Sequence, residues 1–208
     1  MTFFNACIAV PGRKPDAERA AARAAGWRDC DLRWERLQER ALGALRQGNP
    51  STAARIWRQG WLLAFLRFRR DDPRYAASTA NLGLVARLAG RERLARRRYA
   101  AALKQWGVVP DRIRSMAIAR RGRSSLFHLQ MEAVHWGAYD QSLRNNALRL
   151  ADDTALRLDL ASRGQPAPGQ RCDRWPGEKP AIFDDLRKFL GAALLIAADV
   201  QNPDHIRH

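Results

Sequence analysis

Residues 76–107 constrain the fold of this chain more than any other part of the sequence. Small and aromatic residues recur there at helical offsets, and Gly90 interrupts their period of about 3.6 residues. Gly90 is therefore expected to end a first helix. The small residues permit two helix backbones to approach closely, and Tyr99 fills the space between them. The pattern predicts two short antiparallel helices, and its residues are Leu82, Gly83, Ala86, Gly90, Ala95, Tyr99 and Ala102.

This spacing resembles the tetratricopeptide repeat, whose consensus is W-x2-L-G-x2-Y, A-x3-F and P. Thr79 stands at the first aromatic position, and Pro110 follows a little after the place of the closing proline. The same register fits a second pair 42 residues earlier, with Leu37, Ala41, Ala44, Gly48, Ala53, Trp57 and Gly60. A third copy keeps only the helix–glycine–helix rhythm, with Leu126, Leu129, Ala133, Gly137 and Ser142.

The resemblance implies an all-α fold, a superhelical array of antiparallel helix pairs closed by a C-terminal capping helix. Residues 1–30 are expected to form an arm and a short helix, followed by helix pairs at 31–72, 73–109 and 110–162. The third unit is predicted to contain a helix at 112–121 and a pair, 124–136 and 139–162, hinged at Gly137. Residues 163–180 contain four prolines and three glycines, which predict a loop. Residues 181–208 are expected to hold the capping helix and a tail.

The chain is strongly basic, with a formal net charge of +16 over 208 residues and a pI of about 11.3. Between residues 87 and 124 there are 12 Lys or Arg against two acids, Glu92 and Asp111. Such a field favours acidic partners, whether nucleic acid, an anionic membrane surface or an acidic protein. A codon composition that favours arginine is the other explanation of the excess.

The three cysteines are far apart and form no C-x-x-C motif, so neither a disulfide framework nor a zinc site is expected. The longest apolar run, residues 189–198, is too short to span a bilayer, and the N-terminus is a poor signal peptide. We therefore expect a cytoplasmic protein without a metal or other cofactor, and its oligomeric state stays open.

In tetratricopeptide repeats the first helices of successive pairs line a groove that binds a ligand. The resemblance implies a non-catalytic scaffold that binds an acidic or amphipathic protein segment in an arginine-lined, apolar groove. Arg46, Arg87 and His135 would attract charge, and leucine and phenylalanine side chains would supply contact area. The other explanation is that these leucines pack against neighbouring helices or the final helix. The full set is Leu42, Leu45, Arg46, Leu84, Arg87, Leu88, Phe127, Met131 and His135.

Two other functions compete with the scaffold. The first is nucleic-acid binding through the basic region 87–124, where a basic patch would contact phosphates. That patch comprises Arg96, Arg97, Arg98, Arg120, Arg121 and Arg123. The aromatic stripe Trp57, Trp61 and Phe65 also suits single-stranded nucleic acid, although such a stripe is more often core.

The second competing function is a helical ribonuclease or metal enzyme centred on His128 and His135. Glu132 and His135 have the E-x-x-H spacing of di-iron helix bundles, but the sequence contains no second such motif. Arg123 and His128 fit a loose R-x4-H pattern of helical ribonucleases, which 33 arginines also make expected by chance. The sequence therefore predicts no catalytic residue.

Overall fold

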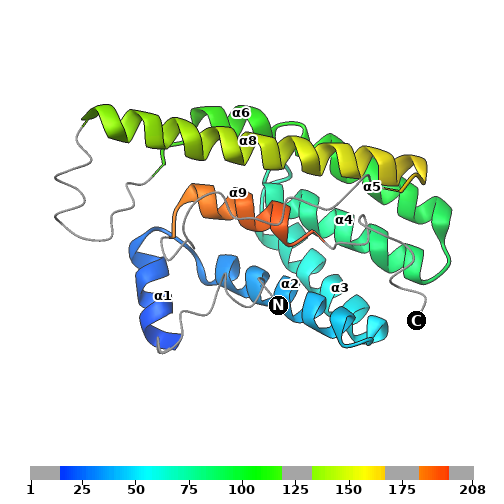
Figure 1. Cartoon of the computed structure of the whole chain (residues 1–208). Helices are drawn as coiled ribbons and strands as arrows, with labels where there is room; N and C mark the ends of the chain where they lie inside the picture. The colour runs from blue at the N-terminus through cyan, green and yellow to red at the C-terminus, as the bar shows by residue number, and fades with distance from the viewer. Residues whose placement is uncertain (1–14, 119–132, 167–182, 197–208) are drawn as a thin grey trace.

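The computed structural model describes residues 15–118, 133–166 and 183–196 (Figure 1). All regular structure in these ranges is helical and none is strand, so the all-α prediction is confirmed. The helices are α1 (Pro15–Ala24), α2 (Asp29–Arg46), α3 (Pro50–Arg67), α4 (Pro73–Leu88), α5 (Glu92–Trp106), α6 (Val109–Ser115), α8 (Ala133–Arg163) and α9 (Asp185–Leu194).

Glycine turns join the helices of the first two pairs. Gly48, between α2 and α3, has φ 72°, and Gly90, between α4 and α5, has φ 70°. Both lie in the left-handed region, where a side chain is disfavoured. After the first turn, the Asn49 side chain accepts a hydrogen bond from the Thr52 backbone N–H at 3.2 Å and caps α3. The turns reverse the chain, so that α3 packs along α2 and α5 packs along α4.

The pair α4–α5 packs closely because a ring on one helix fits a gap on the other. A methyl group added at Gly83 of α4 would lie 2.9 Å from Cε1 of Tyr99 on α5. Tyr99 is buried, so the ring has little room to move away. The predicted close approach of Gly83 and Tyr99 is confirmed.

The register proposed for the earlier pair places buried residues at the same positions. α3 also packs on α4, and α5 packs on α8, so each helix from α2 to α5 contacts the next one. The matched buried positions are Leu37 and Thr79, Ala41 and Gly83, Ala44 and Ala86, Ala53 and Ala95, Trp57 and Tyr99, and Gly60 and Ala102.

The third pair differs from the prediction. α8 runs without a break through Gly137, so the predicted hinge is wrong. Gly137 is exposed, and a methyl group there would meet nothing within 4 Å. The glycine therefore costs the helix only its own propensity, about 1 kcal/mol. The helix predicted at 112–121 is also shorter, because α6 ends at Ser115. Leu126 and Leu129 lie outside the described residues.

Three polar contacts join α2 to α4, at successive turns of both helices. We call them the polar ladder. They bring together side chains that are all buried. The three rungs are Arg74 Nη1 to Asp31 Oδ1 at 2.6 Å, Trp34 Nε1 to Ser78 Oγ at 2.8 Å, and Asn81 Nδ2 to Gln38 Oε1 at 2.8 Å.

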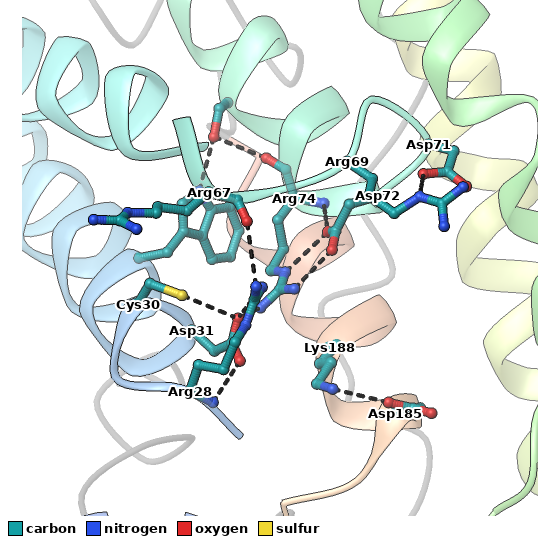
Figure 2. A network of polar contacts seen from close by, with 12 residues as sticks. Arg28, Cys30, Asp31, Arg67, Arg69, Asp71, Asp72, Arg74, Asp185 and Lys188 are labelled. Atoms are coloured by element: carbon teal, nitrogen blue, oxygen red, sulfur yellow. Dashed lines mark hydrogen bonds and ion pairs between the residues drawn. The ribbon is translucent and has the colours of Figure 1, made fainter. Parts of the chain in front are cut away.

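Arg74 forms the charged end of the polar ladder (Figure 2). Its Nε and Nη2 donate to Asp72, the N-cap of α4, at 2.9 and 2.7 Å. Its guanidinium also stands 3.9 Å from the centroid of the Phe68 ring. Burial acts to raise the pKa of Asp31, but Arg74 and the Arg28 backbone N–H outweigh it and leave the pKa lowered. The buried charges therefore compensate one another.

We expect Gly83→Ala to destabilise the protein by about 1–3 kcal/mol, because the added methyl group displaces the buried Tyr99 ring. Gly43 in α2 is the matched control, since a methyl group there meets nothing within 4 Å. Gly43→Ala should stabilise the protein by about 0.5–1 kcal/mol, because it reduces the backbone entropy lost on folding. Urea unfolding followed by circular dichroism measures both changes. Equal effects of the two substitutions would contradict the packing of α4 on α5.

Candidate partner-binding groove

The face of α2 and α4 that the sequence predicts as the binding groove is covered by a helix of the same chain. α9 packs along α4 and also contacts α6 and α8 (Figure 1). The Asn81 side chain of α4 donates to the Leu195 carbonyl, just after α9, at 3.0 Å. Leu84 is completely buried and Leu42 nearly so. These two leucines are buried and therefore not accessible to a partner in this structure.

The other predicted groove residues are described only in part. Leu45 and Leu88 are partly buried, and Arg46 is exposed. Arg87 lies 3.5 Å from Glu92 of α5 and donates to the Ala161 carbonyl of α8 at 3.4 Å. Its contacts thus join α4, α5 and α8. Phe127 and Met131 lie outside the described residues, as does the side chain of His135.

A buried ion pair attaches α9 to α2. Arg187 Nη2 lies 2.9 Å from Glu35 Oε2, and both side chains are buried. The guanidinium also stands 4.3 Å from the centroid of the Phe183 ring and 5.2 Å from that of Trp27. Burial raises the pKa of Glu35, and the positive charge of Arg187 opposes the rise. The pair holds residues that are 152 positions apart in the sequence.

A different apolar groove is open on α2 and α3. Two hollows of about 400 and 450 Å³ share Arg33, Leu37 and Gln59, so they form one continuous surface, which we call the α2/α3 groove. No residue of α4 lines it, which places it on the side of the first pair that α4 leaves uncovered. Its remaining lining residues are Arg19, Asp29, Leu32, Arg36, Arg40, Leu62, Leu63, Leu66 and Arg67.

Large apolar side chains project from the α3 side of this groove. Leu62 is 51% exposed and Leu66 is 64% exposed. These are two of the five large apolar residues that are exposed in the described ranges. Single exposed leucines are ordinary, but contiguous exposed apolar surface indicates an interaction site. The concentration of exposed leucines on α3 therefore indicates a candidate binding surface.

The charge around the α2/α3 groove is mainly positive. Five arginines and one acid, Asp29, line it, and Asp29 already pairs with Arg23 at 2.7 Å. Arg33, Arg40 and Arg67 form no ion pair with any residue in the described ranges. Arg19 pairs with Asp29 at 3.8 Å and Arg36 with Glu18 at 3.4 Å, so the groove offers apolar contact flanked by three cations that no acid of the described chain neutralises.

The predicted basic patch is described only in part. Arg96 and Arg97 are exposed on α5, and Arg98 is partly buried. Arg96 lies 3.5 Å from Glu92, while Arg98 stands 6.0 Å from the centroid of the Trp61 ring on α3. Arg120, Arg121 and Arg123 lie outside the described residues.

The metal and nuclease alternatives depend on residues that the structure does not describe, namely His128, Glu132 and the side chain of His135. In the described part of the chain, no three His, Cys, Asp or Glu side chains cluster to hold a metal ion. None of the described helices is long and apolar enough to cross a membrane. Comparison of the chain with protein-family models, curated proteins and solved structures finds no match.

Glu39 adds a second acidic group near the ion pair of Glu35. Burial, together with the negative charge of Glu35, raises the pKa of Glu39 to about 8, from an ordinary value of 4.5. Between these two pH values the folded protein keeps a proton that the unfolded chain has released. The contribution of Glu39 to stability is therefore complete below about pH 4.5 and is lost as the pH rises towards about 8.

We expect Glu39→Gln to have nearly the same melting temperature as the wild type near pH 5 and a higher one near pH 8. Glutamine is neutral at every pH. The variant therefore does not lose the stability that the wild type loses when the unfolded chain releases the proton of Glu39. Asp152→Asn, which removes an exposed carboxylate on α8, is the control for the loss of one acidic group. Differential scanning calorimetry across this range measures the three proteins. Parallel curves for wild type and Glu39→Gln would contradict the prediction.

Proposed function

We propose that the protein is a non-catalytic scaffold that binds an acidic amphipathic helix of a partner protein in the α2/α3 groove. The observation that carries this proposal is the exposure of Leu62 and Leu66 beside arginines that lack an acidic partner in the described ranges. We propose the same general function that the sequence predicts, but at a different binding site. The face of α2 and α4 is covered by α9, whereas the α2/α3 groove is open.

The packing of the helix pairs supports a helix as the ligand. α4 packs on one side of the pair α2–α3 and buries it, while the opposite side carries the groove. In a tetratricopeptide-like array, each pair is covered by a helix of its neighbour, and within the described residues this face of the first pair is bordered by the short helix α1, whose Arg19 lines the groove. A partner helix seated there takes the place of such a covering helix. Its apolar stripe would contact the leucines, as in other helix-in-groove complexes.

The charge supports an acidic ligand over a second copy of the chain. Arg33 and Arg40 on α2 and Arg67 at the end of α3 flank the leucines. Two copies that met through the same groove would bring these arginines together, and the net charge of +16 would add to the repulsion. A helix with glutamates beside its apolar stripe would cover the leucines and pair its glutamates with the arginines. Electrostatic attraction would also speed its association at low salt.

The test uses three fluorescein-labelled synthetic helical peptides of equal length with the same leucine stripe. Their flanking positions carry Glu, Gln or Lys, and fluorescence polarisation measures binding to the full chain. We expect the Glu peptide to bind at least about tenfold more tightly than the Gln peptide, a difference of roughly 1.4 kcal/mol. The Lys peptide should not bind. Equal binding of all three peptides would overturn the acidic specificity.

Substitutions locate the binding site. We expect Leu62→Ser with Leu66→Ser to weaken binding of the Glu peptide by roughly 30-fold or more, the loss typical of central interface residues. Leu156→Ser is the matched control, because Leu156 on α8 is 49% exposed and lies outside the groove. Arg33→Glu should also weaken binding, and Arg149→Glu on α8 is its charge control. Light scattering on each variant detects dimers, and a dimer that dissociates when the leucines change would assign the groove to a second copy instead.

A further inference from the structure

The other side of α3 carries a second surface of different character. Trp61 and Phe65 lie there with arginines from α3, from the turn after it and from α5. We call this surface the basic–aromatic face. It is distinct from the α2/α3 groove, because none of its residues lines the groove. Trp61, Phe65, Arg70 and Arg98 are in contact with one another, and we include two exposed arginines by their place in the sequence, Arg58 one turn before Trp61 and Arg97 next to Arg98.

The aromatic rings of this face form a stack with guanidinium groups beside it. The Trp61 and Phe65 rings are stacked, with centroids 5.4 Å apart and planes inclined by 21°. Arg98 of α5 stands 6.0 Å from the Trp61 centroid, and Arg70 stands 5.7 Å from the Phe65 centroid. Phe65 is 45% exposed and Trp61 is partly buried. The aromatic stripe thus begins in the core at Trp57 and reaches the surface one and two turns later.

The positive charge of this face is not balanced by nearby acids. α3 contains no Asp or Glu, and Glu92, the single acid of α5, pairs with Arg87 and Arg96. Arg58 and Arg97 are exposed and form no ion pair with any residue of the described ranges.

Most arginines of the long helix α8, unlike Arg58 and Arg97, lie beside an acidic residue. Three of its four arginines pair with an aspartate four residues away, namely Arg144–Asp140, Arg157–Asp153 and Arg163–Asp159. A codon composition that favours arginine would raise the arginine content of both regions, but it would not supply α8 with paired aspartates and leave α3 without an acid. The separation of charge therefore indicates a polyanionic ligand for the basic–aromatic face.

We propose that the basic–aromatic face binds single-stranded nucleic acid without strict sequence preference. A positively charged surface follows the phosphate backbone, and exposed aromatic rings or guanidinium planes extend the stack with bases. A duplex keeps its bases stacked inside and so could use only the arginines. An anionic membrane would likewise use charge, but it has no bases to stack on the Trp61–Phe65 pair. Stacking is therefore the property that distinguishes the proposed ligand.

The experiment uses the full chain and a fluorescein-labelled strand of 20 thymidine nucleotides, with fluorescence anisotropy as the readout. Contacts from about four arginines predict a slope of roughly −2.8 in a plot of log affinity against log salt. Raising the salt from about 50 to about 200 mM should then weaken binding about 50-fold. Competition by a 20-base-pair duplex should be weaker than competition by the unlabelled strand. Equal competition, or binding to phosphatidylserine vesicles without binding to the strand, would overturn the proposal.

Two variants test stacking and charge separately. We expect Phe65→Ala to weaken binding of the strand about tenfold while leaving the melting temperature almost unchanged, because the ring is exposed and supplies stacking. A surface that acts by charge alone would not respond to this change, so an unchanged affinity would overturn the proposal. Arg97→Glu with Arg98→Glu should reduce the magnitude of the salt slope by about 1.4. Arg149→Glu with Arg163→Glu on α8 makes the same change in net charge and is the control. If this control reduced the salt slope equally, the proposal would also be overturned.

Discussion

The polar ladder between α2 and α4 is the constraint on which the rest of the structure depends. Its three contacts form only when the two helices keep one axial position, because a shift by one turn would separate Arg74 from Asp31, Trp34 from Ser78 and Asn81 from Gln38. An unpaired buried charge costs far more than the pair gains, so the ladder acts mainly by excluding other registers. It also places α4 between α3, α5 and α9. α4 therefore has no free face, and any binding surface has to lie on its neighbours.

The two proposed surfaces follow from this arrangement. α3 contacts α2 on one flank and α4 on another, and the remainder of its circumference is open. Towards α2 the open part carries leucines, and towards α5 it carries aromatic rings and arginines. One helix thus offers two surfaces with different ligand chemistry. The leucines of α3 suit the apolar stripe of a partner helix, whereas the Trp61–Phe65 stack suits the flat ring of a base.

Local spacing was sufficient to predict the helices of the first two pairs and the contact between Gly83 and Tyr99, because these depend on residues within one helical hairpin. The candidate groove was not predicted. The apolar residues of α3 recur at helical spacing, but spacing does not show which of them a neighbouring helix covers, and Leu62 and Leu66 are the ones left open. Gly137 was taken for a turn because glycine suits both a turn and an exposed helical position. The coverage of α4 by α9 depends on Arg187 and Glu35, which no local pattern connects.

The distance along the chain between Glu35 and Arg187 has a consequence for biosynthesis. Arg187, the counter-ion of Glu35, is the 152nd residue that the ribosome adds after it, which at cellular elongation rates takes roughly 8 to 30 s. During that interval the nascent polypeptide presents the face of α2 and α4, with its leucines and an uncompensated carboxylate, to the surrounding solution. Chaperones that recognise apolar surface have this window in which to act. Completion of the native topology is thus tied to the arrival of α9.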